Sequence, residues 1–470
     1  MQTQRDFYRY YLELLKRFVA KGIYMKKLAE EATIENVLES IKENKYNRTQ
    51  DIIDFIMALE QIEGNMFISL DAKWGAGKTF YVRQIEQTLN YLTKKAKNMD
   101  IEENVETAFS KNPLGSLELE HTYFPVYYNA WLYDNHSDPL MSLILSITKT
   151  CECYYDAKLS NSTLSEKITS LLDSFSFSIG CVQIGSNFEN VREKFSGKDI
   201  LSVVKTEEEI RDKVKEIFNS IIVENVEKLV IFIDELDRCR PSFAIEMLER
   251  IKHYFDDDRI IFIASVNREQ LIHSISKYYG TNFDSTGYLD KFFDRNVYLP
   301  EIDTSLGGAQ TVVFTDRKYH LKNIAEGLNA YYHLSLRENL RFYEYISYAI
   351  SSGYVRDRDG QGMVLSAFIP IIAILSIKDE DRKRRFMQGD SSILSNLFEN
   401  VPALYQLTCR FGENQGEESE ENFKIGYTKI KEVYDYAFGI GEKRWYNGAI
   451  EINNNFKEIC IKLCNGFKMK

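Results

Sequence analysis

The sequence of 470 residues has little cysteine, proline and glycine, with 7, 7 and 24 of each. The cysteines are odd in number and form no CxxC pair, which argues against a structural zinc site or a disulfide framework and indicates a reduced, cytoplasmic protein. Few prolines and glycines indicate a helix-rich chain with few linkers. The first residues lack a continuous apolar core, so we expect no secretory signal.

Long apolar runs and an excess of positive charge are also absent. The longest apolar run, residues 363–377, is interrupted by Ser366 and Pro370 and is shorter than the roughly 18–20 residues that span a bilayer. We therefore predict no membrane span here, but a buried helix pair broken at Pro370. The 59 Lys and Arg against 70 Asp and Glu give a net charge of −11, which disfavours a diffuse nucleic-acid binder without excluding a local basic groove.

Five short apolar runs, rich in β-branched and aromatic residues, alternate with helical stretches. They cover residues 67–70, 124–128, 229–233, 260–265 and, more weakly, 296–299. Continuous apolar strands separated by helices predict a parallel sheet that is buried on both faces. We therefore predict an α/β core.

Helical periodicity surrounds this core. The expected domains are an N-terminal helical segment (1–45), the core (46–300) with an insertion (132–228), a helical lid-like domain (301–400) and a C-terminal helical region (401–470). Helical periodicity covers residues 5–45, and the first helix is expected to carry Tyr8, Tyr11, Leu12, Leu15 and Phe18 on one face. Further helices are expected at residues 25–41, 52–62 and 206–218, the last with a capping box formed by Thr206 and Glu209.

The segment AKWGAGKT, Ala72–Thr79, follows the first apolar run and precedes a helical stretch. It fits the phosphate-loop pattern G-x-x-x-x-G-K-[ST], with Ala72 at the first glycine position. In such a loop, backbone N–H groups and a helix N-terminus surround a phosphate. Lys78 can reach the β- and γ-phosphates, and the Thr79 hydroxyl can ligate Mg²⁺. The expected nucleotide-binding residues are Ala72, Trp74, Gly75, Ala76, Gly77, Lys78, Thr79 and Phe80.

A second motif, IDELDRCRP, ends the third apolar run. Asp234 and Glu235 follow a buried strand at its carboxyl end, where ligands of α/β proteins bind. We predict that Asp234 holds Mg²⁺, directly or through water, and that Glu235 polarises the attacking water. Asp237 could take either role. Alone, the motif favours a solvated acidic turn, but its position after a phosphate loop favours nucleotide hydrolysis.

Further catalytic candidates are weaker. Asn267 follows the next strand and could face the γ-phosphate or the water, or simply end the strand in a turn. Of the arginines that could neutralise transition-state charge, we include Arg295 among the predicted catalytic residues, with Lys78, Glu235 and Asn267. The other candidate arginines are Arg238, Arg240, Arg268, Arg337 and Arg341. For each of these arginines taken alone, Arg295 included, the sequence favours a surface or salt-bridge role over a catalytic one.

In their order, these motifs resemble the KAP family of P-loop NTPases, in the additional-strand class that uses a catalytic glutamate. The resembling segments are WGAGKT, YYNAWLYDNHSDPL, IDELDRCRP, IASVNREQL, YLDKFF and the LP at 299–300, over residues 48–300, and then SLRENLRFY and FIPIIAIL, to about residue 380. Two positions depart from the family pattern. Ala72 replaces the common first glycine, and Asn267 stands where many members have an acidic residue.

The resemblance implies a five-stranded parallel sheet in the order 5-1-4-3-2, ATP and Mg²⁺ as ligands, and the roles already given to Lys78, Thr79, Asp234 and Glu235. GTP is disfavoured because no NKxD motif follows the loop. Many relatives insert membrane spans between the two motifs. Residues 132–228 hold none, so we expect a soluble, cytoplasmic member. A bacterial setting and defence against phage are further implications of the family alone.

We therefore expect Mg²⁺-dependent ATP hydrolysis that drives a conformational or assembly switch, in a homo-oligomer or with a partner protein. Two alternatives stay open: an ATP-gated scaffold with negligible turnover, and a nucleic-acid-stimulated ATPase. The basic run Arg382–Arg385 favours a solvated helix end over a nucleic-acid patch. Trp131 is expected to pack in the interior, whereas Trp74 could cover the nucleotide or contact a neighbour.

Overall fold

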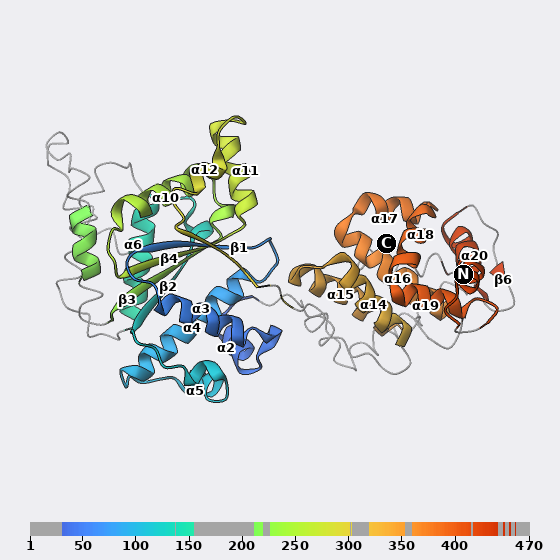
Figure 1. The fold of residues 1–470 in the computed structure, drawn as a ribbon, viewed down its shortest axis with the longest axis horizontal. Coiled ribbons are helices and arrows are strands. Elements are labelled where there is room, and N and C mark those ends of the chain that lie inside the picture. Colours follow the sequence, from blue (N-terminus) through green and yellow to red (C-terminus); the bar gives the residue numbers. More distant parts are fainter. Residues whose placement is uncertain are drawn as a thin grey trace, which may run out of the picture. The chain divides into compact units, whose positions relative to one another are not determined.

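The computed structural model describes residues 31–136, 138–154, 211–219, 226–300, 302, 319–352, 360–414, 417–439, 445–446, 451–452 and 456. One compact unit comprises Ala32–Asp303, and a second includes Thr304–Lys470 (Figure 1). The first expected helix, which would carry Tyr8 to Phe18, lies outside the described residues. The expected division of the C-terminal part at residue 400 stays a prediction.

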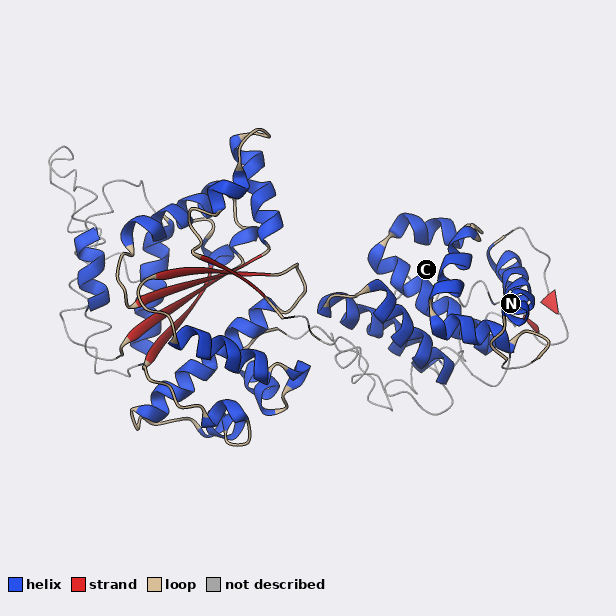
Figure 2. Ribbon diagram, in the orientation of Figure 1, coloured by secondary structure: helices blue, strands red, loops and turns tan. Residues whose placement is uncertain are grey.

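A five-stranded parallel sheet forms the centre of the first unit, in the order β2-β3-β4-β1-β5 (Figure 2). The strands are β1 (Met66–Asp71), β2 (Tyr123–Asn129), β3 (Lys228–Asp234), β4 (Ile260–Val266) and β5 (Arg295–Tyr298). The predicted strands and the predicted order 5-1-4-3-2 are confirmed. Strand β4 lies between β1, which leads into the phosphate loop, and β3, which ends in the acidic motif.

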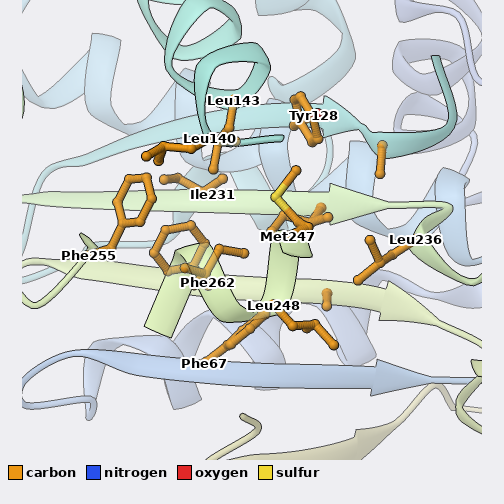
Figure 3. Close-up of a cluster of buried hydrophobic side chains, with 14 of the residues drawn as sticks. Phe67, Tyr128, Leu140, Leu143, Ile231, Leu236, Met247, Leu248, Phe255 and Phe262 are labelled. Carbon is orange, nitrogen blue, oxygen red and sulfur yellow. The ribbon is translucent and has the colours of Figure 1, made fainter. Parts of the chain in front are cut away.

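Helices cover both faces of the sheet (Figure 1). One face carries α2 (Ile34–Lys42), α3 (Thr49–Glu60), α4 (Lys78–Ala96) and α5 (Glu103–Phe109), and the other carries α6 (Pro139–Tyr154), α10 (Pro241–Tyr254), α11 (Arg268–Tyr279) and α12 (Ser285–Leu289). Because successive strand residues point to opposite faces, Phe67 joins the cluster under α6 and α10 (Figure 3), whereas Ile68 joins the cluster under α3 and α4. This double burial explains why the strands are continuously apolar.

Two helix boundaries differ from the expected ones. The Thr33 side chain caps α2 by accepting a hydrogen bond from the Asn36 N–H, so the expected helix at 25–41 does not include residues 31–33, and its residues 25–30 lie outside the described residues. Helix α3 begins at Thr49, three residues before its expected start. Residues 211–219 are helical, which confirms the described part of the helix expected at 206–218.

The described residues of the second unit are helical apart from a short strand pair. It contains α14 (Tyr319–Tyr332), α15 (Leu336–Ser352), α16 (Gly360–Lys378), α17 (Glu380–Met387), α18 (Ser392–Asn400), α19 (Pro402–Arg410) and α20 (Glu420–Phe438), with β6 (Trp445–Tyr446) and β7 (Glu451–Ile452). Among the described residues, no helix combines the length and apolarity that crossing a membrane requires.

Helix α16 corrects one prediction, because it runs unbroken through Pro370 instead of forming a helix pair. Proline within a helix removes one hydrogen bond and costs about 3 kcal/mol. The helix lies against α14, α15 and α17, and every residue from Val364 to Leu375 is buried. We infer that burial on all sides outweighs the cost of the proline.

Candidate nucleotide-binding site

The loop Ala72–Gly77 joins β1 to α4. Gly75 and Gly77 have φ angles of 86° and 88°, in the left-handed region that side chains disfavour. Helix α4 begins at Lys78, directly after Gly77, so its first N–H groups adjoin the loop. A glycine-bearing turn that ends at a helix N-terminus is suited to bind a phosphate.

Lys78 is buried above this loop. Its Nζ donates to the carbonyl oxygens of Ala72, at 2.5 Å, and of Lys73, at 3.4 Å. Burial lowers the pKa of Lys78, and the nearby carboxylates of Asp237, Asp234 and Asp71 oppose this change. The ammonium group therefore lies between the loop and the acidic ends of the strands.

Asp234 lies at the carboxyl end of β3, level with Asn129 of β2, and only 1% of its surface is exposed. Both of its carboxylate oxygens accept hydrogen bonds. Oδ1 accepts from the N–H of Glu235, and Oδ2 accepts from the hydroxyl of Tyr127, each at 3.0 Å. The carboxylate orientation is therefore fixed from two sides.

Glu235 follows in a left-handed conformation, with φ 60° and ψ 24°. Its Oε1 lies 2.8 Å from Nη1 of Arg238, and its Oε2 accepts from Nδ2 of Asn129 at 3.4 Å. Burial raises the pKa of Glu235, and the Arg238 charge opposes this rise. The Asn129 side chain also accepts hydrogen bonds from the N–H groups of Trp131 and Leu132. Asn129 thereby caps the 3-10 helix Ala130–Tyr133.

The two tryptophans lie at the same edge of the sheet. Trp74 is 47% exposed, and its Nε1 donates to Oδ2 of Asp237, so this alternative acidic candidate is tied to the phosphate loop. Trp131 is 52% exposed and lies under the Arg238 guanidinium, 5.6 Å from its ring centre. The expected burial of Trp131 is wrong, because the chain turns out of the sheet directly after Asn129.

Of the two weaker catalytic candidates, Asn267 lies at this edge of the sheet and Arg295 does not. Asn267 follows β4, is buried, and uses its Oδ1 to cap α11 by accepting from the Gln270 N–H at 3.3 Å. Arg295 begins β5, level with Ile68 in the middle of β1, and is exposed. The structure therefore does not bring Arg295 to Lys78 and Asp234.

The other candidate arginines have partners elsewhere or lie in the second unit. Arg268 pairs with Asp290, and Arg240 pairs with Asp134. Arg337 and Arg341 belong to α15 of the second unit.

Oxygen donors at this edge fit a magnesium ion that is bound together with a nucleotide. Within the described part of the chain, no three His, Cys, Asp or Glu side chains are grouped to hold a metal. Mg²⁺ bound with phosphates needs only one or two protein donors, because phosphate oxygens and waters complete its shell. Thr79, the second residue of α4, and the buried Asp234 offer one hydroxyl and one carboxylate.

Sequence analysis missed Arg48, which is 3% exposed and lies beside the loop. Its Nη2 donates to the carbonyl oxygens of Ala76, at 3.4 Å, and Pro300, at 3.1 Å, and its guanidinium lies over the Tyr81 ring. Burial lowers the pKa of Arg48 to about 10, and its Nε and Nη1 have no hydrogen-bond partner. No local pattern marks this arginine, since its partners are 28 and 252 residues away.

This combination of fold and site defines a P-loop NTPase, with a strand inserted between its two motif strands. The family model described as KAP family P-loop domain matches residues 33–333, and the chain belongs to the KAP family. Membership supports nucleotide binding and hydrolysis in general, and the resemblance seen in the sequence is confirmed. Among curated proteins, a search finds no match.

Proposed function

We propose that this protein binds ATP with Mg²⁺ at the loop Ala72–Thr79 and hydrolyses it. The observation that carries the proposal is the arrangement of Lys78 between the loop carbonyls and the carboxylates at the edge of the sheet. On binding, the β- and γ-phosphates replace the carbonyls of Ala72 and Lys73 as partners of the ammonium group. Bound Mg²⁺ would neutralise phosphate charge, held by Thr79 and Asp234.

Glu235 is the proposed base for the attacking water. A carboxylate whose pKa is raised by burial is better matched to accepting a proton near neutral pH. Arg238 and Asn129 each contact one of its oxygens, and each carboxylate oxygen can accept a further hydrogen bond, so a water can approach Glu235 while these contacts hold its carboxylate in place.

A second candidate function is an ATP-gated scaffold that recruits a partner with negligible turnover. The Arg238 guanidinium, paired with Glu235, disfavours protonation of this carboxylate and so weakens it as a base. Bound ATP could then change the conformation of the protein without being hydrolysed. A third candidate, stimulation by nucleic acid, is disfavoured. In the basic run of α17, Lys383, Arg384 and Arg385 each pair with a carboxylate.

The proposed work of hydrolysis is a conformational or assembly switch in a cytoplasmic homo-oligomer or partner complex, with bacterial defence against phage as the setting. The setting rests on the family alone. The oligomer or partner is supported by the pairing of Arg238, Arg240 and Arg268 with carboxylates of their own chain. A charge-neutralising arginine from a neighbouring subunit would complete the site without breaking these pairs.

Phosphate release from Mg·ATP, measured at several protein concentrations, tests these functions. We expect wild-type turnover to rise with concentration and to vanish in Glu235→Gln, because the amide cannot accept the proton. Glu269→Gln on the exposed surface of α11 is the matched control. ATP binding without turnover in the wild type favours the scaffold, and turnover only with DNA or RNA favours the third candidate.

Equilibrium binding of ATP tests the site itself. Lys78→Ala should abolish binding, whereas Lys73→Ala, an exposed lysine of the same loop, should not. Unchanged ATP affinity in Lys78→Ala would contradict the assignment of the loop.

A further inference from the structure

Tyr127 of β2 contacts two elements at once. Its hydroxyl donates to Oδ2 of Asp234 at 3.0 Å, and its ring lies under the guanidinium of Arg83, 4.5 Å from the ring centre. The next residue, Tyr128, points to the opposite face and bonds Ser142.

Arg83, on helix α4, packs its guanidinium against the Tyr127 ring. Its Nη1 pairs with Oε2 of Glu86 at 2.5 Å, and both side chains are largely buried. Thr79, Arg83 and Glu86 are spaced by four and then three residues, so they lie along one face of α4. The guanidinium is therefore held between a carboxylate of its own helix and a ring of β2.

We propose that Tyr127 is a positioning residue for the magnesium site, because it fixes Asp234 on β3 relative to the helix that carries Thr79. The inference rests on the proposed function, since it takes Thr79 and Asp234 as the metal's protein donors. Mg²⁺ requires near-octahedral geometry at about 2.1 Å, so small displacements of a donor weaken binding. Outer-shell partners of metal ligands act in this way, and their loss typically costs about 10–100-fold in metal affinity.

A positioning role for the Tyr127 hydrogen bond can be distinguished from a role in folding alone. The hydrogen bond orients one carboxylate oxygen, so its loss changes the response to Mg²⁺ more than it changes folding or nucleotide binding without metal. Tyr127→Phe removes the hydroxyl and keeps the ring under Arg83. Tyr128→Phe is the matched control, because it removes a buried tyrosine hydroxyl from the opposite face of the same strand.

The experiment titrates Mg²⁺ into the full-length protein with a fluorescent ATP analogue and records the half-saturating Mg²⁺ concentration. Affinity for the analogue in EDTA and the thermal midpoint are measured alongside. We expect Tyr127→Phe to raise the half-saturating concentration about tenfold or more, with unchanged affinity in EDTA. Tyr128→Phe should leave the Mg²⁺ response unchanged. Arg83→Gln, which keeps the hydroxyl but frees the ring, should change it in the same direction as Tyr127→Phe.

Asp234→Asn separates failure of this inference from failure of the proposed function. If Asp234→Asn leaves the Mg²⁺ response unchanged, the proposed metal site is wrong. If Asp234→Asn weakens the response while Tyr127→Phe or Arg83→Gln does not, the positioning role is overturned. An equal loss of affinity with and without Mg²⁺ in Tyr127→Phe also overturns it, because that result indicates a structural role only.

Discussion

Replacing Glu86 with glutamine should change how the stability of the nucleotide-binding unit depends on pH. Glu86 on α4 is 6% exposed. Burial raises the pKa of this carboxyl from its ordinary 4.5 to about 7, although the Arg83 charge and the Gln87 hydrogen bond oppose the rise. The folded protein therefore binds a proton at Glu86 that the unfolded chain releases more readily.

The sign and size of the effect follow from these two pKa values. A folded-state pKa above the unfolded value contributes stability that is fully present below pH 4.5 and is lost as the pH rises through about 7. At 1.36 kcal/mol for each pH unit between the two values, the full loss is about 3 kcal/mol. About 2 kcal/mol of this loss falls between pH values of about 5.5 and 8. Glutamine does not titrate, so the variant lacks this component.

Urea unfolding at a series of pH values measures the difference. In a Trp445→Phe background, the remaining tryptophans, Trp74 and Trp131, both belong to the unit that contains Glu86. The stability advantage of wild type over Glu86→Gln should fall by about 2 kcal/mol across the range of about pH 5.5 to 8. Glu269→Gln, on the exposed surface of α11, should show no comparable fall.

A difference between wild type and Glu86→Gln that stays constant over this range would refute the reasoning. It would mean that the ion pair with Arg83 offsets the burial of the carboxylate completely, so that Glu86 is ionised throughout.

Two further substitutions test packing in the nucleotide-binding unit. Gly115→Ala should destabilise the protein by about 1–3 kcal/mol, since its Cβ would lie 2.3 Å from the Phe109 carbonyl oxygen, and urea unfolding that matches wild type would contradict the packing described. Arg48→Met should cost about 1–3 kcal/mol, because the carbonyls of Ala76 and Pro300 lose their shared donor, and an unchanged thermal midpoint would show that water replaces the guanidinium.

The fold could be predicted from the sequence because its determinants are local. Continuous apolar runs bounded by polar residues define the five strands, and the phosphate loop after the first strand fixes the direction of the sheet's functional edge. The strand order came from the family resemblance. Local patterns failed where distant packing decides the outcome, as in α16, where burial on all sides keeps the helix intact through Pro370.

The candidate site could be predicted from the sequence only in part. Lys78, Asp234 and Glu235 are marked by motifs, and the structure brings them to one edge of the sheet. The hydrogen bond of Tyr127 to Asp234 joins residues 107 apart and depends on the register of β2 against β3. The sequence offers one signal for this contact: Tyr127 lies in a buried strand, so its hydroxyl needs a hydrogen-bond partner, and the neighbouring strand ends in acidic residues.

The position of Arg48 has a practical consequence for dissecting the protein. A fragment that starts at β1 would hold every motif residue, yet it would lose this arginine and the apolar faces of α2 and α3, including Val37, Ile52 and Ile56. Because α2 and α3 pack against α4, its buried residues Val82 and Ile85 would then lose part of their cover. Minimal fragments made for binding studies should therefore begin before Ala32, because a shorter piece would resemble a defective ATPase for reasons unrelated to its chemistry.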